Sequence, residues 1–421
     1  MSGDQLAPEC DESTDINQSS PEADEETSGY CNLSPFGPCY LVELPSELFL
    51  HICSFLDAKF VAETVGCVCK LFHSIVKNEK FWKVRIRKRW HKKYPAIPVN
   101  DSCFDWKKAC IHREHQAKLW ANPDETLDHF SFTKGLYAPV DVVHLMKAGS
   151  IVAAGSRDRC VYLLDLNKLT LDQPDSIDNV ASILNAHKGW VWTIDSLDNR
   201  LSTGSWDTYI KLWDMADNNK LIQEFKLKSA ALCSHFGQDL IVAGSYDKKI
   251  YLLDPRSGDI IAENKYHRQP VLCLAVNENY IVSGSEDSTV CVYDKRAASL
   301  LKTVTFEEYP MSLSYLDDQL WVGDKTGQIH LVDATDGDFN VVETYDVGHR
   351  GKITSVICTL GALFTSSADK TVKVLEPSVD PSVIQTLNKQ TGEVARIDFQ
   401  NDVLAIANSD ISVEIYRPKE S

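Results

Sequence analysis

The sequence predicts a mixed fold, in which a helical module near the N-terminus precedes an all-β ring of seven small sheets. Three observations predict it. One pattern, an apolar run, a pair of small residues, a tight turn and a second apolar run, recurs seven times between residues 150 and 416. Apolar residues between 41 and 90 follow helical spacing instead, and the first 40 residues contain few apolar side chains. The chain therefore divides into segments of different physical character.

The N-terminal segment is acidic. Residues 1–58 contain twelve Asp or Glu residues and neither Lys nor Arg. A segment such as residues 1–40 buries too little apolar surface to offset the entropy lost when it orders. We therefore expect residues 1–40 to form a disordered acidic tail.

Charge and cysteine content exclude several classes of function. The formal net charge is −17, which argues against nucleic acid as the main partner, because duplex binding requires Lys and Arg to neutralise phosphates. No apolar run approaches the ~18 residues of a membrane helix, so we expect no membrane partner. The thirteen cysteines are scattered without a Cys-x-x-Cys pair. We expect reduced thiols, no metal or other cofactor, and a cytoplasmic protein whose access to the nucleus stays open.

Residues 41–90 show helical periodicity. Pro45 suits the first positions of a helix and Asp57 suits a turn or cap. Two sets of apolar residues follow helical spacing: Leu48, Ile52, Phe55 and Leu56, then Val61, Val65, Val68, Phe72 and Ile75. The second set predicts a long one-sided apolar stripe. A further helix is predicted from Asp105 to Ala121, ended by Asn122-Pro123, with Trp106, Ala109, Cys110, Ala117 and Trp120 on one face.

The repeated pattern has a period near 40 residues. The turn positions, most of them Asp, are 158, 207, 247, 287, 326, 369 and 410, and Thr326 stands where an Asp is expected. This period predicts a seven-bladed β-propeller. The last repeat reaches only a third strand, Ile411–Tyr416, so we expect His129–Phe132 to supply its fourth strand and close the ring.

A second spacing supports the repeat. A histidine lies 20 residues before the turn Asp in three repeats, and a Ser or Thr lies four residues before that Asp. The sets are His187, Thr203 and Asp207 with Trp213; His267, Ser283 and Asp287; and His349, Thr365 and Asp369. They resemble WD repeats, and the resemblance implies that these side chains form hydrogen bonds inside one blade. Because the same histidine recurs with repeat partners, we interpret it as structural and expect no catalytic residues.

The helical module resembles an F-box. Leu44-Pro45-Ser46-Glu47-Leu48, the Leu56-Asp57 turn, Val68-Cys69-Lys70-Leu71-Phe72 and Phe81-Trp82 occur in the family's order, with Phe72 where Trp is frequent. The resemblance implies that the module binds a Skp-type adaptor, and through it a cullin–RING ligase. The implied contacts are Leu44, Pro45, Leu48, Ile52, Phe55, Leu56, Cys69 and Phe72. The alternative is a helical cap packed on the chain's own propeller.

The order of the parts points to a function. We divide the chain into an acidic tail (1–40), an F-box (41–90), a helical linker (91–126) and a seven-bladed WD-repeat propeller (127–417). This order resembles the F-box/WD-repeat family of substrate receptors of Skp–cullin–F-box ubiquitin ligases. The resemblance implies a non-catalytic subunit that holds a substrate protein. The alternatives are a propeller scaffold without ligase function, or a hydrolase with its site in the central channel.

Residues next to the turns are the candidates for substrate contact. We expect Arg157, Trp190, Trp206, Tyr246, Arg268, Glu286 and Arg350 to lie on one face of the propeller. Trp, Tyr and Arg are enriched at binding hot spots. Some of these residues could instead pack within strands. Arg157, Arg268 and Arg350 could hold a phosphorylated segment, although the acidic propeller argues against it.

Overall fold

The computed structural model describes residues 44–99, 104–170, 175–176 and 180–419. The acidic tail predicted for residues 1–40 lies outside these ranges. The protein forms two compact units, Met1–Ile52 and Cys53–Ser421. Among the described residues, no helix combines the length and apolarity needed to cross a membrane. The nine cysteines within these ranges are all free thiols.

The helices precede the ring along the chain. They are α1 (Ser46–Phe55), α2 (Ala58–Glu63), the 3-10 turn η1 (Val65–Cys67), α3 (Lys70–Val76), α4 (Glu79–Arg89), α5 (Trp106–Ala121) and α6 (Pro123–Thr126). The cap predicted at Asp57 is confirmed, and Asp105, where a helix was predicted to begin, is also an N-cap. Asp57 accepts a hydrogen bond from the Lys59 N–H at 2.8 Å and begins α2, and Asp105 accepts one from the Lys108 N–H at 2.8 Å and begins α5.

The stripe predicted from Val61 to Ile75 is not one continuous helix. Cys69 adopts an extended conformation, and its sulfur accepts a hydrogen bond from the Phe72 N–H at 3.5 Å. A residue with these properties is an N-cap, so the helical path stops at η1 and starts again at α3. Val68, which belongs to the predicted stripe, is exposed.

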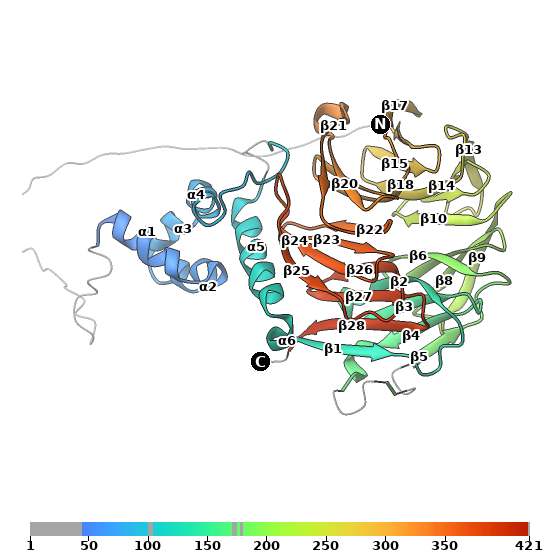
Figure 1. Cartoon of the computed structure of the whole chain (residues 1–421), viewed down its shortest axis with the longest axis horizontal. Helices are drawn as coiled ribbons and strands as arrows, with labels where there is room; N and C mark the ends of the chain where they lie inside the picture. Colours follow the sequence, from blue (N-terminus) through green and yellow to red (C-terminus); the bar gives the residue numbers. More distant parts are fainter. Residues whose placement is uncertain (1–43, 100–103, 171–174, 177–179, 420–421) are drawn as a thin grey trace, which may run out of the picture. The chain divides into compact units, whose positions relative to one another are not determined.

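The remainder of the described residues form a ring of seven four-stranded antiparallel sheets, shown in Figure 1. Blade 1 contains β2 (Val140–Met146), β3 (Ile151–Ser156), β4 (Val161–Asp165) and β5 (Val180–Leu184). Blade 2 contains β6 (Val191–Leu197), β7 (Arg200–Ser205), β8 (Tyr209–Asp214) and β9 (Lys220–Lys226). Blade 3 contains β10 (Ala231–Phe236), β11 (Ile241–Ser245), β12 (Ile250–Leu253) and β13 (Ile260–Asn264).

The next blades repeat the same order. Blade 4 contains β14 (Val271–Val276), β15 (Tyr280–Ser285), β16 (Thr289–Asp294) and β17 (Ser299–Thr305). Blade 5 contains β18 (Pro310–Leu316), β19 (Gln319–Asp324), β20 (Gln328–Asp333) and β21 (Asn340–Asp346). Blade 6 contains β22 (Ile353–Cys358), β23 (Leu363–Ser367), β24 (Val372–Leu375) and β25 (Val383–Leu387). The predicted seven-bladed propeller is confirmed.

Blade 7 is built from both ends of the ring. It contains β26 (Val394–Gln400), β27 (Val403–Asn408) and β28 (Ser412–Pro418), and its fourth strand is β1 (Leu127–Phe132). Strand β1 pairs with β28 in an antiparallel register that places Phe130 opposite Ile415. The closing strand predicted at His129–Phe132 is therefore confirmed, and blade 7 reaches the same four strands as the others.

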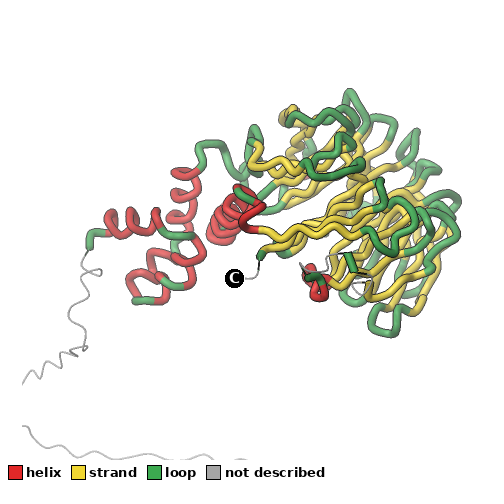
Figure 2. The backbone as a smooth tube through the Cα atoms, turned by 60° about the horizontal axis from the view of Figure 1, so that its bottom comes forward, coloured by secondary structure: helices red, strands yellow, loops and turns green. Residues whose placement is uncertain are grey.

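The first strand of each blade lies innermost. The first strands of neighbouring blades contact one another around the whole ring. They therefore line the central channel, and successive blades pack face to face through the apolar clusters between them. Figure 2 shows the strands gathered in the ring, with loops joining them at its two ends. These two ends are the surfaces available for binding.

Ring closure generates a stability prediction. Phe130 is about 1 % exposed in a cluster shared by blades 7 and 1. Replacing a buried Phe by Ala costs about 3–5 kcal/mol. We expect Phe130→Ala to lower the free energy of unfolding of the propeller by this amount in denaturant titrations. Ser131→Ala is the control, because Ser131 is exposed on the same strand; an equal loss in both variants would contradict a special role for β1.

Candidate functional site

A hydrogen-bond network holds the turn of blade 2. His187 bonds Asp207 through Nδ1 at 3.0 Å and Thr203 through Nε2 at 2.8 Å. The Trp213 indole N–H donates to the Thr203 hydroxyl at 2.9 Å. Burial opposes ionisation of Asp207, but the hydrogen bond and attraction of His187 outweigh it, and the pKa of Asp207 falls to about 2. The network thus fixes a charged carboxylate under the turn.

Blades 4 and 6 carry shorter versions of the network. His267 bonds Asp287 at 3.3 Å and Ser283 at 2.8 Å. His349 bonds Asp369 at 3.0 Å and Thr365 at 2.9 Å. Burial is the main cause that lowers the pKa of both histidines. Both imidazoles are buried and each has its hydrogen-bonding capacity used, so these positions stabilise turns.

Blades 1 and 3 use a tyrosine that sequence reasoning missed. The Tyr162 hydroxyl donates to Asp158 at 2.5 Å, and the Tyr251 hydroxyl donates to Asp247 at 2.6 Å. Burial, followed by the hydrogen bond to the carboxylate, raises the pKa of both tyrosines. Each tyrosine follows its turn Asp by four residues. This four-residue spacing could have predicted from the sequence that the tyrosine bonds the turn Asp.

In blade 5 the carboxylate that accepts hydrogen bonds from the turn comes from a different sequence position than in the other blades. The repeat pattern aligned Thr326 with the turn Asp, but Asp324 makes the corresponding contacts. Asp324 accepts hydrogen bonds from the N–H groups of Thr326, Gly327 and Gln328 at 2.8–2.9 Å, and it bonds His330 at 3.2 Å. Thr326 nevertheless occupies the turn position, because the Lys325 N–H bonds the Tyr309 carbonyl as the residue before the turn Asp does in the other blades. The carboxylate under the turn comes from two residues earlier, from Asp324.

One backbone hydrogen bond recurs at the turns of all seven blades. The N–H of the residue before each turn position bonds the carbonyl of the residue that leads into the blade's first strand, at 2.9–3.3 Å. The pairs are Arg157–Pro139, Trp206–Trp190, Tyr246–Ala230, Glu286–Pro270, Lys325–Tyr309, Ala368–Lys352 and Ser409–Glu393. These fourteen residues therefore lie at one end of the ring, which we call the turn rim.

An aromatic cluster occupies the turn rim at blades 2 and 3. The ring centroid of Trp206 lies 6.2 Å from Trp190, 5.8 Å from Trp192 and 5.9 Å from Tyr246. Trp190, Trp206 and Tyr246 are each 40–52 % exposed. The sequence placed these three on one face, and the structure brings them together. A half-exposed Trp and Tyr cluster is the composition of an interaction hot spot.

Arg157 belongs to this cluster. Its guanidinium forms two hydrogen bonds with Asp141, at 2.8 and 2.9 Å, and lies 4.9 Å from the ring centroid of Trp190. Hydrogen bonding to Asp141 is the main cause that raises the pKa of Arg157. The charge of Arg157 is already matched, so it is poorly placed to receive a phosphate.

The other predicted substrate residues lie farther around the rim. Arg268 and Glu286 are exposed on blade 4, and Arg350 is exposed on blade 6. The backbone N–H groups of Arg268 and Arg350 donate to Asp287 and Asp369 at 2.7 and 2.8 Å. These arginines are thus spread along the rim instead of forming a compact anion site.

The F-box residues differ in exposure. In the first unit Leu48 and Ile52 are exposed, as is Pro45, and Leu44 is half-buried. In the second unit Phe55 is 77 % exposed, and Leu56 and Cys69 are half-buried. Phe72 is only 3 % exposed, so its role is packing inside the module. Phe60, Val68 and Leu71 are exposed apolar residues that the sequence reasoning did not select.

A buried ion pair joins the helices of the second unit. Glu114 on α5 is 1 % exposed and bonds Arg85 of α4 at 2.7 and 3.0 Å. It also accepts from the Ala58 N–H at 3.0 Å. Burial opposes the charged form of Arg85, but Glu114 outweighs it and raises the pKa of Arg85. Helices α2 and α4 are therefore tied to α5.

The other side of α5 packs against the propeller. Arg113 stacks on Trp90 and Tyr94, at 4.4 and 4.6 Å from their ring centroids, and pairs with Glu376 at 3.4 Å. Trp120 packs edge-on against Phe364 of blade 6, with centroids 5.6 Å apart. Gln116 donates to Asp402 at 2.5 Å. Helix α5, which Figure 1 shows beside blade 6, is the connection between helices α2 and α4 and the ring.

The comparisons with known proteins agree with this architecture. The F-box-like family profile matches residues 41–87, and the profile named WD domain, G-beta repeat, matches residues 179–214 and 258–294. A computationally designed protein, Ika8, shares the fold with a TM-score of 0.53 and 20 % identity, over 66 % of this protein and 83 % of its own length. The fold thus defines a propeller protein preceded by an F-box-like segment.

Relatives specify the family. The protein is 37 % identical to F-box/WD repeat-containing protein 9 of Bos taurus and of Homo sapiens, over 90 % of its own length and 82 % of each relative. It is 30 % identical to F-box/WD repeat-containing protein mec-15 of Caenorhabditis elegans, over 47 % of its own length and 50 % of that protein. The chain therefore belongs to the F-box/WD repeat family.

The ion pair on α5 generates a prediction. Glu114→Gln leaves the buried Arg85 guanidinium without a carboxylate, and removing one partner of a buried pair costs about 3–5 kcal/mol. We expect faster amide hydrogen exchange in α2 and α4, measured by mass spectrometry, while the blades keep their protection. Glu125→Gln on the exposed face of α6 is the control. Unchanged exchange in α2 and α4 would contradict the role of Glu114.

Proposed function

We propose that this protein is the substrate-recognition subunit of a Skp–cullin–F-box ubiquitin ligase. The observation that carries the proposal is an F-box-like segment with exposed apolar side chains, joined through α5 to a propeller with an exposed aromatic cluster. The segment binds the Skp-type adaptor, and the turn rim holds the substrate. The cytoplasmic location expected from the sequence is part of the same proposal.

The apolar side chains supply the physical reason for adaptor binding. Leu48 and Phe55 are at least half exposed, and so is Val68. Fully burying one such side chain contributes about 1.5–3 kcal/mol. A small helical module that exposes several large apolar residues is better explained by a protein partner than by solvent contact.

The role of the protein in the ligase is positional. Ubiquitin transfer takes place on other subunits, so this protein raises the rate by holding a substrate lysine near the activated ubiquitin. Helix α5 supports that role, because buried contacts on both of its sides keep α2 and α4 at a fixed distance from the blades. A non-catalytic scaffold that never joins a ligase is the second candidate, and adaptor binding separates the two.

Adaptor binding tests the proposal directly. We expect the double variant Leu48→Ala/Phe55→Ala to co-purify with the Skp-type adaptor at least tenfold less than the wild type, because the apolar contact area is removed. Ile261→Ala is the matched control, since Ile261 is an exposed apolar residue on the outer strand of blade 3. If the double variant retains wild-type adaptor binding, the protein is better described as a scaffold.

The substrate surface has its own test. With the proteasome blocked, we expect Trp206→Ala to lose proteins that co-purify with the wild type, because truncation of a hot-spot Trp costs about 2 kcal/mol or more. Arg296→Ala, on the opposite end of the ring, should leave the set of co-purifying proteins unchanged. An identical set for wild type and Trp206→Ala would place the binding surface elsewhere.

A further inference from the structure

The ring closes where the two ends of the repeat array meet. Strands β26, β27 and β28 of blade 7 come from the end of the array, whereas α5, β1 and β2 precede it or begin it. We call the contacts between these two groups of elements the closure seam. Three histidine–carboxylate pairs cross it, with N–O distances of 2.9, 3.1 and 3.1 Å: His115–Asp402, His129–Glu414 and His144–Asp398. Histidine is the side chain whose charge ordinarily changes near neutral pH, so the contacts that close the ring include titratable groups.

The other histidine–carboxylate pairs among the described residues lie elsewhere. Four histidines bond the turn carboxylate of their own blade: His187, His267, His330 and His349. One pair, His235–Asp195, joins blades 3 and 2 at 3.3 Å. Burial is the main cause that lowers the pKa of His267 and His349, so the turns of blades 4 and 6 favour neutral imidazoles. The pairs at the closure seam are distinguished by their position between the two ends of the array.

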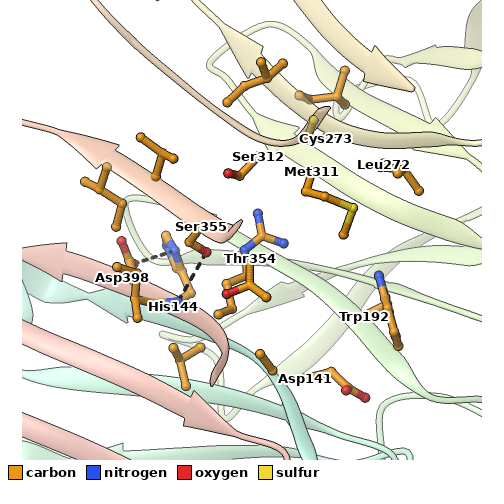
Figure 3. A pocket seen from close by; sticks show the side chains of 18 of the residues that line it. Asp141, His144, Trp192, Leu272, Cys273, Met311, Ser312, Thr354, Ser355 and Asp398 are labelled. Carbon is orange, nitrogen blue, oxygen red and sulfur yellow. Dashed lines mark hydrogen bonds and ion pairs between the residues drawn. The ribbon is translucent and has the colours of Figure 1, made fainter. Parts of the chain in front are cut away.

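His144 lies between two carboxylates. Its Nδ1 atom is 3.1 Å from Asp398, and its Nε2 atom is 2.8 Å from the Ser196 hydroxyl and 3.7 Å from Asp195. Figure 3 shows the contact between His144 and Asp398. Only the protonated imidazole donates from both ring nitrogens. Burial opposes this charged form, but Asp398 outweighs burial and the pKa of His144 is raised, although the positive charge of Arg396 acts against it.

His115 attaches α5 to the turn between β26 and β27. Its Nε2 atom lies 2.9 Å from Asp402, and this hydrogen bond is the main cause that raises the pKa of His115. Burial opposes ionisation of Asp402, but His115 outweighs it and the pKa of Asp402 is lowered. Lys59 and Asp57 also face His115 and act on it with opposite signs, and His112 faces Asp402 from the same helix. The charged forms of His115 and Asp402 therefore stabilise each other.

His129 holds the closing strand from inside blade 7. Its Nε2 atom lies 3.1 Å from Glu414, whose side chain is 5 % exposed, and its ring stacks on Tyr416 with centroids 4.4 Å apart. Asp124 also faces His129 and is itself paired with Lys389 at 2.6 Å. Strand β1 is thus held in the blade by a side-chain contact as well as by strand pairing.

We propose that the closure seam is a proton-dependent clasp, in which protonated His115 and His144 hold blade 7 against α5 and blade 1. Loss of either proton weakens the matching ion pair and loosens the ring where it closes. Because α5 also contacts α2 and α4, the clasp controls how firmly those helices are attached to the ring. The inference does not depend on the proposed function.

The clasp is strongest at mildly acidic pH. A histidine whose pKa is higher in the folded than in the unfolded chain contributes stability that is complete below its ordinary pKa of about 6.5 and is lost as the pH rises through its folded pKa. Asp402, whose pKa is lowered, contributes stability that is complete above about pH 3.9 and is lost as the pH falls through its folded pKa. The clasp is therefore tightest between about pH 4 and about pH 6.5. His267 contributes with the opposite sign, because its pKa is lowered.

Hydrogen exchange of the full-length protein, measured by mass spectrometry, tests the inference. Labelling is carried out at about pH 5.5 and about pH 8, on either side of the ordinary histidine pKa, with times scaled for the intrinsic pH dependence of amide exchange. We expect the protection of α5, β2 and β26 to be at least about fivefold lower at the higher pH. The strands of blade 4 should keep or gain protection, because His267 favours the neutral form.

Variants assign the pH dependence to the two histidines. His115→Gln and His144→Gln cannot carry the proton, so at the lower pH they should show the low protection that the wild type has at the higher pH, in α5 and in β2 respectively. His115→Lys places a permanent charge next to Asp402 and should keep α5 protected at both pH values. His91→Gln, which replaces an exposed histidine outside the seam, is the matched control.

Equal protection of the seam at both pH values in the wild type would overturn the inference. So would an unchanged pH dependence in His115→Gln, or a loss of α5 protection at the higher pH in His115→Lys. A fall spread evenly over all seven blades would also contradict it, because such a fall reports global unfolding. His115 lies at the surface, so its variants decide the question even where His144→Gln fails to fold.

Discussion

The buried charges of helix α5 are the constraint on which the arrangement of the second unit depends. Glu114 faces Arg85 and the start of α2, whereas Arg113, the neighbouring residue, faces Trp90, Tyr94 and Glu376. Taking either charge out of water is costly unless its partner is present. The buried charges of the helix are therefore compensated only when α2, α4 and the propeller all pack against it. Arg113 and Glu114, which are adjacent and opposite in charge, thus link the propeller to helices α2 and α4.

In the propeller the tight turn of a blade is stabilised by a carboxylate that accepts hydrogen bonds, and different blades use different partner side chains for it. Blade 2 uses His187 with Asp207, blade 1 uses Tyr162, and blade 5 uses Asp324 with His330. In each case a carboxylate accepts hydrogen bonds below the turn, and the partner side chain is exchangeable. The geometry is the same among the blades because the rim hydrogen bond recurs in all seven. Because the backbone bond is constant, the side chains at the turn rim can differ from blade to blade without changing the turn.

The turn rim is the recognition surface in the proposed function. The aromatic cluster offers apolar area whose neighbouring charge is already matched, since Arg157 is held by Asp141. Because α5 packs on both the ring and helices α2 and α4, a substrate on the rim would be held at a fixed distance from those helices.

Local pattern determined much of this protein. The period near 40 residues, the His-to-Asp spacing and the motif around Leu44–Phe72 predict the ring, its turns, its closing strand and its family, because each depends on residues close in sequence or repeated at fixed intervals. Helix α5 was also predicted, from the apolar residues on one face between Trp106 and Trp120 and from its stop at Asn122-Pro123. The buried face of that helix was only partly predicted, because Arg113 and Glu114 are residue types expected at the surface.

Tertiary structure decided what periodicity does not encode. The pairing of Arg85 with Glu114 requires two helices to meet, and the use of Asp324 as the carboxylate under the turn at Thr326 depends on the contacts of a single turn. The sequence by itself determined the fold and family of this protein, whereas packing between distant segments decided which buried charges are paired with one another.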